Sequence, residues 1–463
     1  MTPYDDVPYA NRPYAQTHPD HLAVLGRLHG LDPPPVASAR VLDLGASEGG
    51  NLIPMALTLP DARFTGVELA ATPVQRGNQT VRDLGLTNVR LVQMDLLDID
   101  TAFGEFDYIV AHGLYAWTPE PVREKILAIA RANLSPRGIA FVSYNAYPGG
   151  HLRRHLRNAM LLHIGDASDP AARVERAREM LRLLGAGRPE PSILHDAVAR
   201  EAQEVLKQSD SSLFHDYLSG VYAPCSLRDF LAHATRHDLR YLTDAAVLDT
   251  WNVRLAPETI AEVDRIAAGD RVLHEQYFDL LRMRAFRQTL LCRNNIAVDA
   301  QWKPERAVEL YVSTRSEHTG PMQFTAPGGV AMSSANTAVV EYLRTLVREW
   351  PQRRLIGHVD APLALELFRS GIVDLHTCLG PAKSAGDRPL ASLLARYEAA
   401  HGLPLISTLD HRALSNDDPS AREFLLLLDG TRNRAALAAA SGLDQQQVEA
   451  RLDRMSRLAL LIS

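Results

Sequence analysis

The chain has 463 residues, of which 46% are hydrophobic and 22% charged, and its formal net charge is −6. This length allows several domains, and the acidic balance argues against binding to nucleic acid or an anionic membrane surface. The sequence lacks a run of about 18 apolar residues, which a membrane span needs. Its polar, acidic N-terminus is unlike a signal peptide, and its three cysteines form no C-x-x-C pair. We therefore expect a cytoplasmic protein without a disulfide scaffold or a zinc site.

Short apolar runs alternate with helical patterns after residue 36, which predicts a parallel sheet covered by helices. Two later apolar runs complete it, so the expected fold is α/β and Rossmann-like, with seven strands. The expected strands are 40–45, 63–69, 89–94, 106–112, 139–145, 239–247 and 286–293. We expect six segments: an N-terminal arm (1–35), the core (36–150), a helical insertion or regulatory region (151–235), the strands that complete the sheet (236–298), a middle α+β domain (299–400) and a C-terminal helical, winged-helix-like domain (401–463).

A glycine-marked turn follows the first expected strand, in the stretch RVLDLGASEGGNLIPMA. Its GASEG matches the G-x-S-x-G pattern of a hydrolase, which would make Ser47 a nucleophile. In that fold several strands precede the serine, whereas the strand beginning at Arg40 is the first of this chain. A dinucleotide-binding G-x-G-x-x-G also fails, because its third position is Ser47. We therefore expect Ser47 to be a loop residue.

Three acids follow successive strands of the predicted sheet. Asp43 lies just before the glycine turn, Glu68 ends the second strand and Asp95 follows the third. Open parallel sheets bind ligands at the carboxyl ends of their strands. There the three acids suit the amino group, the ribose and the adenine of S-adenosylmethionine (SAM); the alternative is that they only cap helices. The expected SAM-binding residues are Asp43, Gly45, Ala46, Ser47, Gly49, Asn51, Glu68, Leu69, Asp95, Leu96 and His112.

Several phrases in residues 1–300 are specific: YDDVPY, THPDHL, LGASEGGNLIPMA, AHGLYAW, VSYNAYPGGH, FHDYL and FRQTLLCR. In these phrases the chain resembles the bacterial class I SAM-dependent methyltransferases that carry a methyltransferase regulatory domain. That group includes rickettsial protein-lysine methyltransferases that modify an outer-membrane protein. The resemblance implies a class I methyltransferase core, SAM as cofactor with S-adenosylhomocysteine as product, and a protein lysine as acceptor. Many relatives have Cys in place of Ala46, a change that leaves the loop backbone intact.

The loops after the fourth and fifth strands carry the candidate acceptor residues. Methyl transfer from a sulfonium needs in-line positioning, and an amine with a pKa of about 10.4 must first lose a proton. An aromatic pocket can hold a cation, and desolvation lowers the pKa of an amine. We expect this pocket to be lined by His112, Tyr115 and Trp117 after the fourth strand and by Tyr144, Asn145 and Tyr147 around the end of the fifth, with His112 also a candidate base. The alternative is that LYAW only packs the loop against the next helix.

The leading hypothesis is N-methylation of a protein, with lysine favoured. Two alternatives stay open: a small-molecule methyltransferase of bacterial metabolism, and a non-catalytic SAM-binding regulator whose tail binds a partner. We expect no nucleic acid partner, and a homodimer formed through the helical insertion. We also expect no metal, because the spaced pair His151 and His155 lacks an acidic or cysteine partner, and HEQYF has Phe278 where a zinc-protease helix has histidine.

The N-terminal arm is aromatic, with Tyr4, Tyr9, Tyr14 and His18, but has too few aliphatic residues to form its own core. Such a segment is ordered only where it docks on another surface. We expect the arm to fold over the cofactor and to narrow the acceptor channel. The alternative is an undocked leader.

Overall fold

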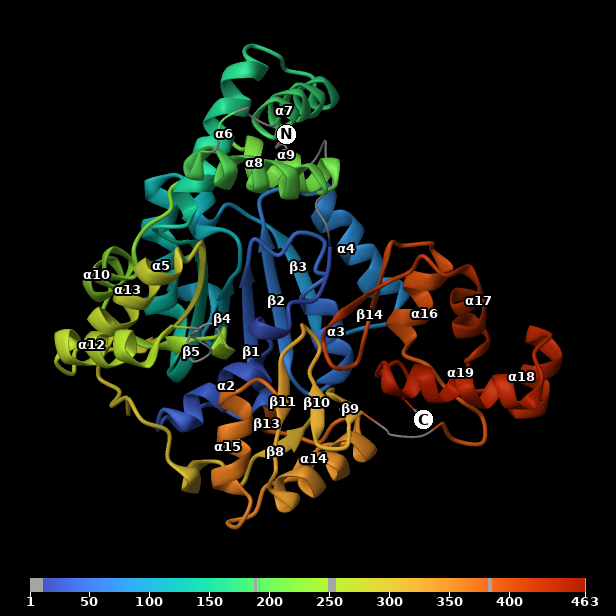
Figure 1. Cartoon of the computed structure of the whole chain (residues 1–463). Coiled ribbons are helices and arrows are strands. Elements are labelled where there is room, and N and C mark those ends of the chain that lie inside the picture. The colour runs from blue at the N-terminus through green and yellow to red at the C-terminus, as the bar shows by residue number, and fades with distance from the viewer. Residues whose placement is uncertain (1–10, 187–189, 191, 249–254, 382–384, 463) are drawn as a thin grey trace.

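The computed structural model describes residues 11–186, 190, 192–248, 255–381 and 385–462. A seven-stranded sheet with helices on both faces lies at its centre, and three smaller units surround the sheet (Figure 1). Tyr4 and Tyr9 of the predicted arm lie outside the described residues.

All seven strands expected from the sequence are present. They are β1 Arg40–Leu44, β2 Arg63–Glu68, β3 Val89–Gln93, β4 Phe106–Ala111, β5 Leu134–Asn145, β6 Leu239–Asp244 and β7 Phe286–Arg293. β4 is buried along its whole length, as the uninterrupted apolar run predicts for a strand covered on both faces. β5 begins at Leu134, five residues before the predicted start, because its first residues pair with the beginning of β4.

The strands lie in the order β3-β2-β1-β4-β5-β7-β6. Neighbouring strands are parallel, except that β7 runs antiparallel to β5 and to β6. After β3 the chain returns to the centre of the sheet to form β4 beside β1. The carboxyl ends of β1 and β4 therefore flank the crevice in which open α/β sheets bind ligands. The predicted α/β, Rossmann-like fold is confirmed.

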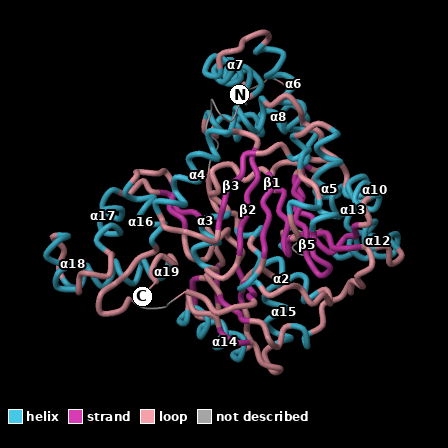
Figure 2. The backbone as a smooth tube through the Cα atoms, turned by 180° about the vertical axis from the view of Figure 1, so that it is seen from behind, coloured by secondary structure: helices cyan, strands magenta, loops and turns pink. Residues whose placement is uncertain are grey.

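Helices cover both faces of the sheet (Figure 2). Leu25 and Ile53 share a core with Tyr108 on one face, and Ile126 and Phe230 share a second core on the other. The helices of the first face are α2 Pro19–Leu28, α3 Leu52–Thr58 and α4 Ala71–Asp83. Those associated with the second are α5 Glu120–Asn133, α10 Leu227–Arg236, α12 Pro257–Ala267 and α13 Arg271–Arg282.

A helical unit projects beyond the sheet (top of Figure 1). It consists of α6 Gly150–Ile164, α7 Pro170–Leu184, α8 Ile193–Leu206 and α9 Asp210–Leu218. Leu156, Leu181 and Tyr217 belong to a core of its own. Asp169 caps α7 by accepting from the Ala172 N–H, with Pro170 at the first helical position. The region is helical as predicted, and the boundaries of the six segments stay a prediction.

The middle unit contains two small sheets and two helices. Its elements are β8 Tyr311–Ser313, β9 Glu317–Gly320, β10 Gln323–Thr325, β11 Ala331–Ser333, α14 Thr337–Glu349, β12 Arg354–Leu355, α15 Ala361–Arg369 and β13 Asp374–His376. Val312 and Phe368 share the core of α2, so this unit is packed against the first face of the large sheet. β9, β12 and β13 were not expected from the sequence, because they are short; β9 and β12 are also largely exposed.

The C-terminal unit combines helices with a two-stranded hairpin. It consists of α16 Leu393–Ala400, β14 Leu405–Ser407, β15 Ala413–Ser415, α17 Pro419–Leu427, α18 Arg434–Ser441 and α19 Gln445–Arg457. Ile406, Phe424 and Leu452 share its core. α17 ends at Leu427, and Asn433 caps the next helix, α18.

Within the described part of the chain, the helices are too short or too polar to cross a lipid bilayer.

Candidate cofactor and acceptor site

Acidic side chains lie at the ends of β1 and β2, beside the glycine turn. Asp43 is buried at 4% exposure. Glu68 accepts hydrogen bonds from the Ser47 N–H (3.1 Å) and the Ala70 N–H (2.9 Å), so its carboxylate ties the glycine turn to the end of β2. Asp95 accepts from the Leu97 N–H (2.9 Å) and thereby caps a short 3-10 turn, as the alternative interpretation of the acids anticipated.

The glycine turn occupies residues 45–51, between β1 and α3. Gly49 has φ +79°, a left-handed conformation that glycine adopts without strain. A Cβ on Gly50 would lie 2.1 Å from Asn11 Oδ1, so this glycine allows the N-terminal arm to approach closely. Ser47 has φ +48° and contributes its backbone N–H to Glu68. Its role in the structure is therefore that of a loop residue.

The amide of Asn51 joins three parts of the chain. Its Nδ2 donates to Asp43 Oδ2 (3.3 Å), while Oδ1 accepts from the Tyr14 N–H (3.1 Å) and the Thr17 hydroxyl (3.0 Å). Oδ1 also lies 3.0 Å from Nε2 of His411, a buried residue of the C-terminal unit with φ +61°. We predicted Asn51 as a cofactor contact, but these bonds direct its side chain to the protein. Asn51 therefore positions Asp43 and the glycine turn.

Burial raises the pKa of Asp43 to about 7, and the charge of Glu68 adds to this rise, while the Asn51 hydrogen bond opposes it. A cationic group placed beside Asp43 would favour its ionised form. The amino group of an amino-acid-like ligand is such a cation.

Two apolar residues border the same edge of the sheet as the acids. Leu69 follows β2 and is 53% exposed, whereas Leu96 is buried at the start of the turn capped by Asp95. An exposed leucine beside a carboxylate suits a ligand with an apolar face, such as adenine. The remaining predicted residues, Gly45 and Ala46, donate their N–H groups to Val67 O (2.8 and 3.0 Å) and so hold the turn against β2.

His112 follows β4, on the other side of the crevice. Its ring lies 4.2 Å from that of Tyr14 in the arm, and its Nδ1 lies 3.0 Å from Ser143 Oγ. Burial lowers the pKa of His112 to about 4, and the nearby charge of Arg12 lowers it further, so the ring is neutral at pH 7. A neutral imidazole can accept a hydrogen bond from a ligand.

The structure corrects the predicted aromatic pocket. Tyr115 and Tyr144 are 4% and 1% exposed and belong to the core on the second face of the sheet. The Tyr115 hydroxyl lies 2.7 Å from His233 Nδ1, and the Tyr144 hydroxyl 3.1 Å from Thr289 Oγ1. Trp117 is half-buried, and its ring lies 4.8 Å from that of Tyr222. Both tyrosines therefore support the loops from below and do not face the crevice, because their rings fill space between the sheet and α10.

Asn145 is a stronger acceptor-side candidate than these tyrosines. It ends β5, is 4% exposed, and pairs in register with Phe286, whose ring packs edge-on against His112. Its Oδ1 is buried and has no hydrogen-bond partner within the described residues. A buried amide oxygen without a donor is costly, so this atom is suited to an incoming N–H group.

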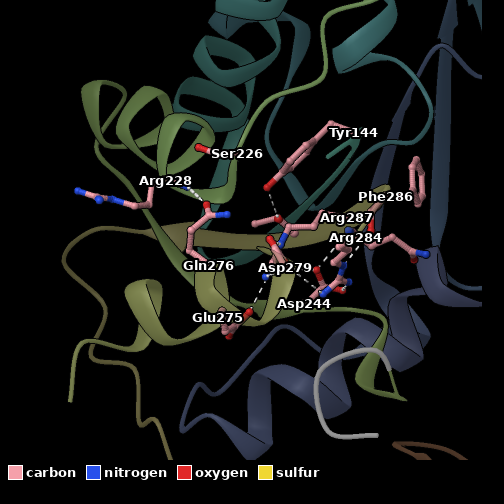
Figure 3. Close-up of polar contacts among 12 residues, drawn as sticks. Tyr144, Ser226, Arg228, Asp244, Glu275, Gln276, Asp279, Arg284, Phe286 and Arg287 are labelled. Atoms are coloured by element: carbon pink, nitrogen blue, oxygen red, sulfur yellow. Dashed lines mark hydrogen bonds and ion pairs between the residues drawn. The ribbon is translucent and has the colours of Figure 1, made fainter. Parts of the chain in front are cut away.

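An ion-pair network surrounds the first residues of β7, next to this site (Figure 3). Arg287 is 1% exposed and binds Asp279 through two bonds, from Nε (2.7 Å) and Nη2 (2.9 Å). Its Nη1 lies 3.1 Å from Glu275 and 3.2 Å from Asp244, and Arg284 pairs with Asp244 at 3.0 Å. The network attaches α13 and β6 to the strand that carries Phe286. No pattern in the sequence indicated this network.

Three family models match separate parts of the chain. The one described as "Methyltransferase domain" matches residues 41–138, "Predicted methyltransferase regulatory domain" matches 209–293, and "PKMT, C-terminal winged helix domain" matches 387–455. The first of these covers β1 to β4 and the glycine turn. The third covers most of the C-terminal unit.

Relatives match longer stretches. One uncharacterized protein of Rickettsia prowazekii (strain Madrid E) is 37% identical over 303 residues, which cover 64% of this chain and 54% of that protein. A second is 32% identical over 240 residues, covering 52% of this chain and 96% of that protein. This chain thus spans about half the length of the first and nearly all of the second.

The solved structure of PKMT2 from Rickettsia typhi in complex with AdoHcy matches with a TM-score of 0.86 and 25% identity, over 98% of this chain and 100% of that one. The match includes all the units around the sheet. The chain belongs to the family of SAM-dependent methyltransferases that carry a methyltransferase regulatory domain.

Proposed function

We propose that this chain transfers the methyl group of SAM to a nitrogen atom of a protein, with a lysine side chain as the favoured acceptor. The observation that carries this proposal is the match along 98% of the chain to PKMT2, a protein lysine methyltransferase whose structure contains AdoHcy. The crevice beside β1 and β4 supports it, since its acids suit the polar groups of that ligand.

In this proposal, SAM supplies a methyl group made electrophilic by the sulfonium. Asp43 accepts from the ligand's amino group, Glu68 from the ribose hydroxyls, and Asp95 lies near the adenine. Glu68 already accepts hydrogen bonds from the Ser47 and Ala70 N–H groups. One carboxylate thus has two roles: it positions the glycine turn and it binds the ribose. The residues that bind the methyl acceptor are those at the ends of β4 and β5 and in the loops that follow.

A lysine amine attacks only in its neutral form, and its ordinary pKa of about 10.4 leaves most of it protonated at neutral pH. His112 and Asn145 offer acceptor atoms at adjacent strand ends, where a nearly dry site lowers the pKa of an amine. His112, whose pKa is about 4, orients the amine through a hydrogen bond and does not retain its proton.

The experiment that tests the proposal is incubation with SAM labelled in the methyl group and a bacterial lysate. We expect label in protein, stable to base as expected for a methylated amine, and absent with the Glu68→Ala variant. Label confined to small molecules would support a metabolite methyltransferase, and absence of any label with intact SAM binding would support the regulator; either result overturns the proposal.

Binding of S-adenosylhomocysteine should strengthen with pH. The pKa of Asp43 is about 7 in the folded protein and lower in the unfolded chain. Without ligand, the protonated carboxyl group therefore stabilises the fold, and this stabilisation is lost as pH rises toward 7. The ligand's cationic amino group favours the ionised carboxylate, so affinity should rise about tenfold from pH 6 to pH 8. Calorimetry on the wild type and Asp43→Asn tests this; an equally steep rise in the variant would contradict it.

Deleting residues 2–17 should weaken cofactor binding and lower turnover. Within the described part of the arm, Asn11 accepts from the Gly50 N–H (2.6 Å) and Tyr14 covers His112. Tyr14→Ala should reduce turnover, while Tyr14→Phe, which keeps the ring, should not. Wild-type affinity and turnover in the deletion variant, with an unchanged circular dichroism spectrum, would show that the arm does not close the site.

We further propose that the protein is cytoplasmic and forms a homodimer through α6 to α9. The three cysteines are free in the structure, which agrees with a reducing compartment. Light scattering on the full chain and on a variant with charged substitutions on the exposed face of α8 tests the dimer; a monomeric wild type would contradict it.

A further inference from the structure

Two histidines lie four residues apart at the end of α10, His233 within the helix and His237 at its C-cap, and a glutamate of α5 faces them. His233 Nε2 lies 2.7 Å from Glu124 Oε2, and His237 Nε2 lies 2.8 Å from Glu124 Oε1. The histidine side chains are only 10% and 14% exposed, whereas Glu124 is half exposed. The cluster lies on the second face of the sheet, away from the SAM crevice.

We propose that Glu124, His233 and His237 bind one divalent transition-metal ion, with zinc as the preferred ion. One ligand atom from each of the three residues lies within 4.8 Å of the others, close enough for a shared ion after a small outward shift of the side chains. Zinc binds histidine nitrogen and carboxylate oxygen at about 2.0–2.2 Å. Two imidazoles exclude magnesium and calcium, which prefer oxygen ligands.

The present contacts leave the cluster incompletely satisfied. His237 Nε2 is buried and makes no well-aligned hydrogen bond despite its short distance to Glu124. An ion between these atoms would satisfy that nitrogen. Arg236 Nη2 lies 4.0 Å from Glu124 on the exposed side of the cluster. A bound ion would replace this long contact. A water molecule on the same side would be its fourth ligand.

A further residue supports the ligand geometry. Nδ1 of His233 lies 2.7 Å from the Tyr115 hydroxyl. A histidine that binds a metal through one nitrogen uses the other to donate to an outer partner, which fixes the ring. Tyr115 is that partner here: with the ion bound, the Nδ1–H donates to the tyrosine oxygen.

The site would connect metal binding to the loop after β4. Tyr115 begins the 3-10 turn Tyr115–Trp117, three residues after His112. Metal bound at α5 and α10 would hold the Tyr115 hydroxyl in one hydrogen-bonded orientation and stabilise this turn from below. The metal would therefore be structural, without contact with the methyl acceptor.

The test uses untagged full-length protein, treated with chelator and dialysed. Titration with Co²⁺ should give visible absorption bands of a tetrahedral site with one equivalent per chain, and Zn²⁺ should displace them and raise the melting temperature. His237→Ala should lose the bands, and Glu124→Gln should weaken binding at least tenfold. His237→Asn, which keeps a polar side chain, should lose them too if the alanine variant does not fold.

The control is the double variant His151→Ala, His155→Ala, which removes a pair of the same spacing on α6. It should bind Co²⁺ as the wild type does. Absence of one-equivalent binding in the wild type overturns the proposal. So does binding that is unchanged in both His237 variants, since the ion would then be held elsewhere.

Discussion

Glu68→Ala should weaken binding of S-adenosylhomocysteine at least tenfold. Hydrogen bonds from two ribose hydroxyls to one carboxylate contribute about 1.5–3 kcal/mol each, and 1.4 kcal/mol corresponds to about a tenfold change in affinity. The variant also loses the bonds that hold the Ser47 and Ala70 N–H groups. Isothermal titration calorimetry at fixed pH measures the effect.

Two further variants separate ribose binding from the support of the loop. Glu68→Gln keeps the shape and one acceptor oxygen, so its affinity should lie between those of the wild type and Glu68→Ala. Glu258→Ala, on the exposed side of α12, should bind as the wild type does. An affinity of Glu68→Ala within a factor of two of the wild type would exclude Glu68 as the ribose-binding residue.

Arg287→Met should lower the free energy of unfolding by about 3–5 kcal/mol, because removing one partner of a buried ion pair leaves uncompensated charge. The guanidinium contacts Asp279, Glu275 and Asp244. Without it, Arg284 would still face Asp244 and Asp279, and Arg271 would still lie 3.7 Å from Glu275, which leaves two cations for three carboxylates. Urea unfolding monitored by tryptophan fluorescence measures the loss. A similar midpoint for the variant and the wild type would show that the network does not stabilise the fold.

The matched control for Arg287→Met is Arg265→Met. Arg265 pairs with Glu262 on the surface of α12, where solvent screens the interaction. Its midpoint should stay unchanged. Since Phe286 precedes Arg287 on β7 and contacts His112, Arg287→Met should also lower turnover at temperatures where the variant remains folded.

The large sheet could be predicted because its strands are buried on both faces. Such strands are continuous apolar runs, and parallel topology brings their carboxyl ends together whatever lies between them. Asp43 and Glu68 could therefore be placed at one crevice from the sequence. Their binding roles stay predictions. The short strands β9 and β12 of the middle unit could not be found, because their exposed residues carry no apolar pattern.

Side-chain direction and distant contacts account for the errors at the site. Tyr115 and Tyr144 follow or end the expected strands, but residue type does not show whether a tyrosine faces the crevice or the core. His233 and His237 carry the spacing H-x-x-x-H, a signal that could have been noted, yet their partner Glu124 lies on another helix. The buried cluster around Arg287 combines residues from β6, α13 and β7, which only the fold brings together.

The hydrogen bond between Asn51 and His411 has a consequence for how the protein is made. These residues are 360 positions apart, and ribosomes add about 5–20 residues per second, so about 18–72 s separate their emergence. During that time the first part of the chain can fold around β1 while the glycine turn still lacks its contact with His411. A nascent or prematurely terminated chain that lacks His411 would thus bind the cofactor less firmly than one that contains it, and a unit translated much later would complete the site assembled from the first part of the chain.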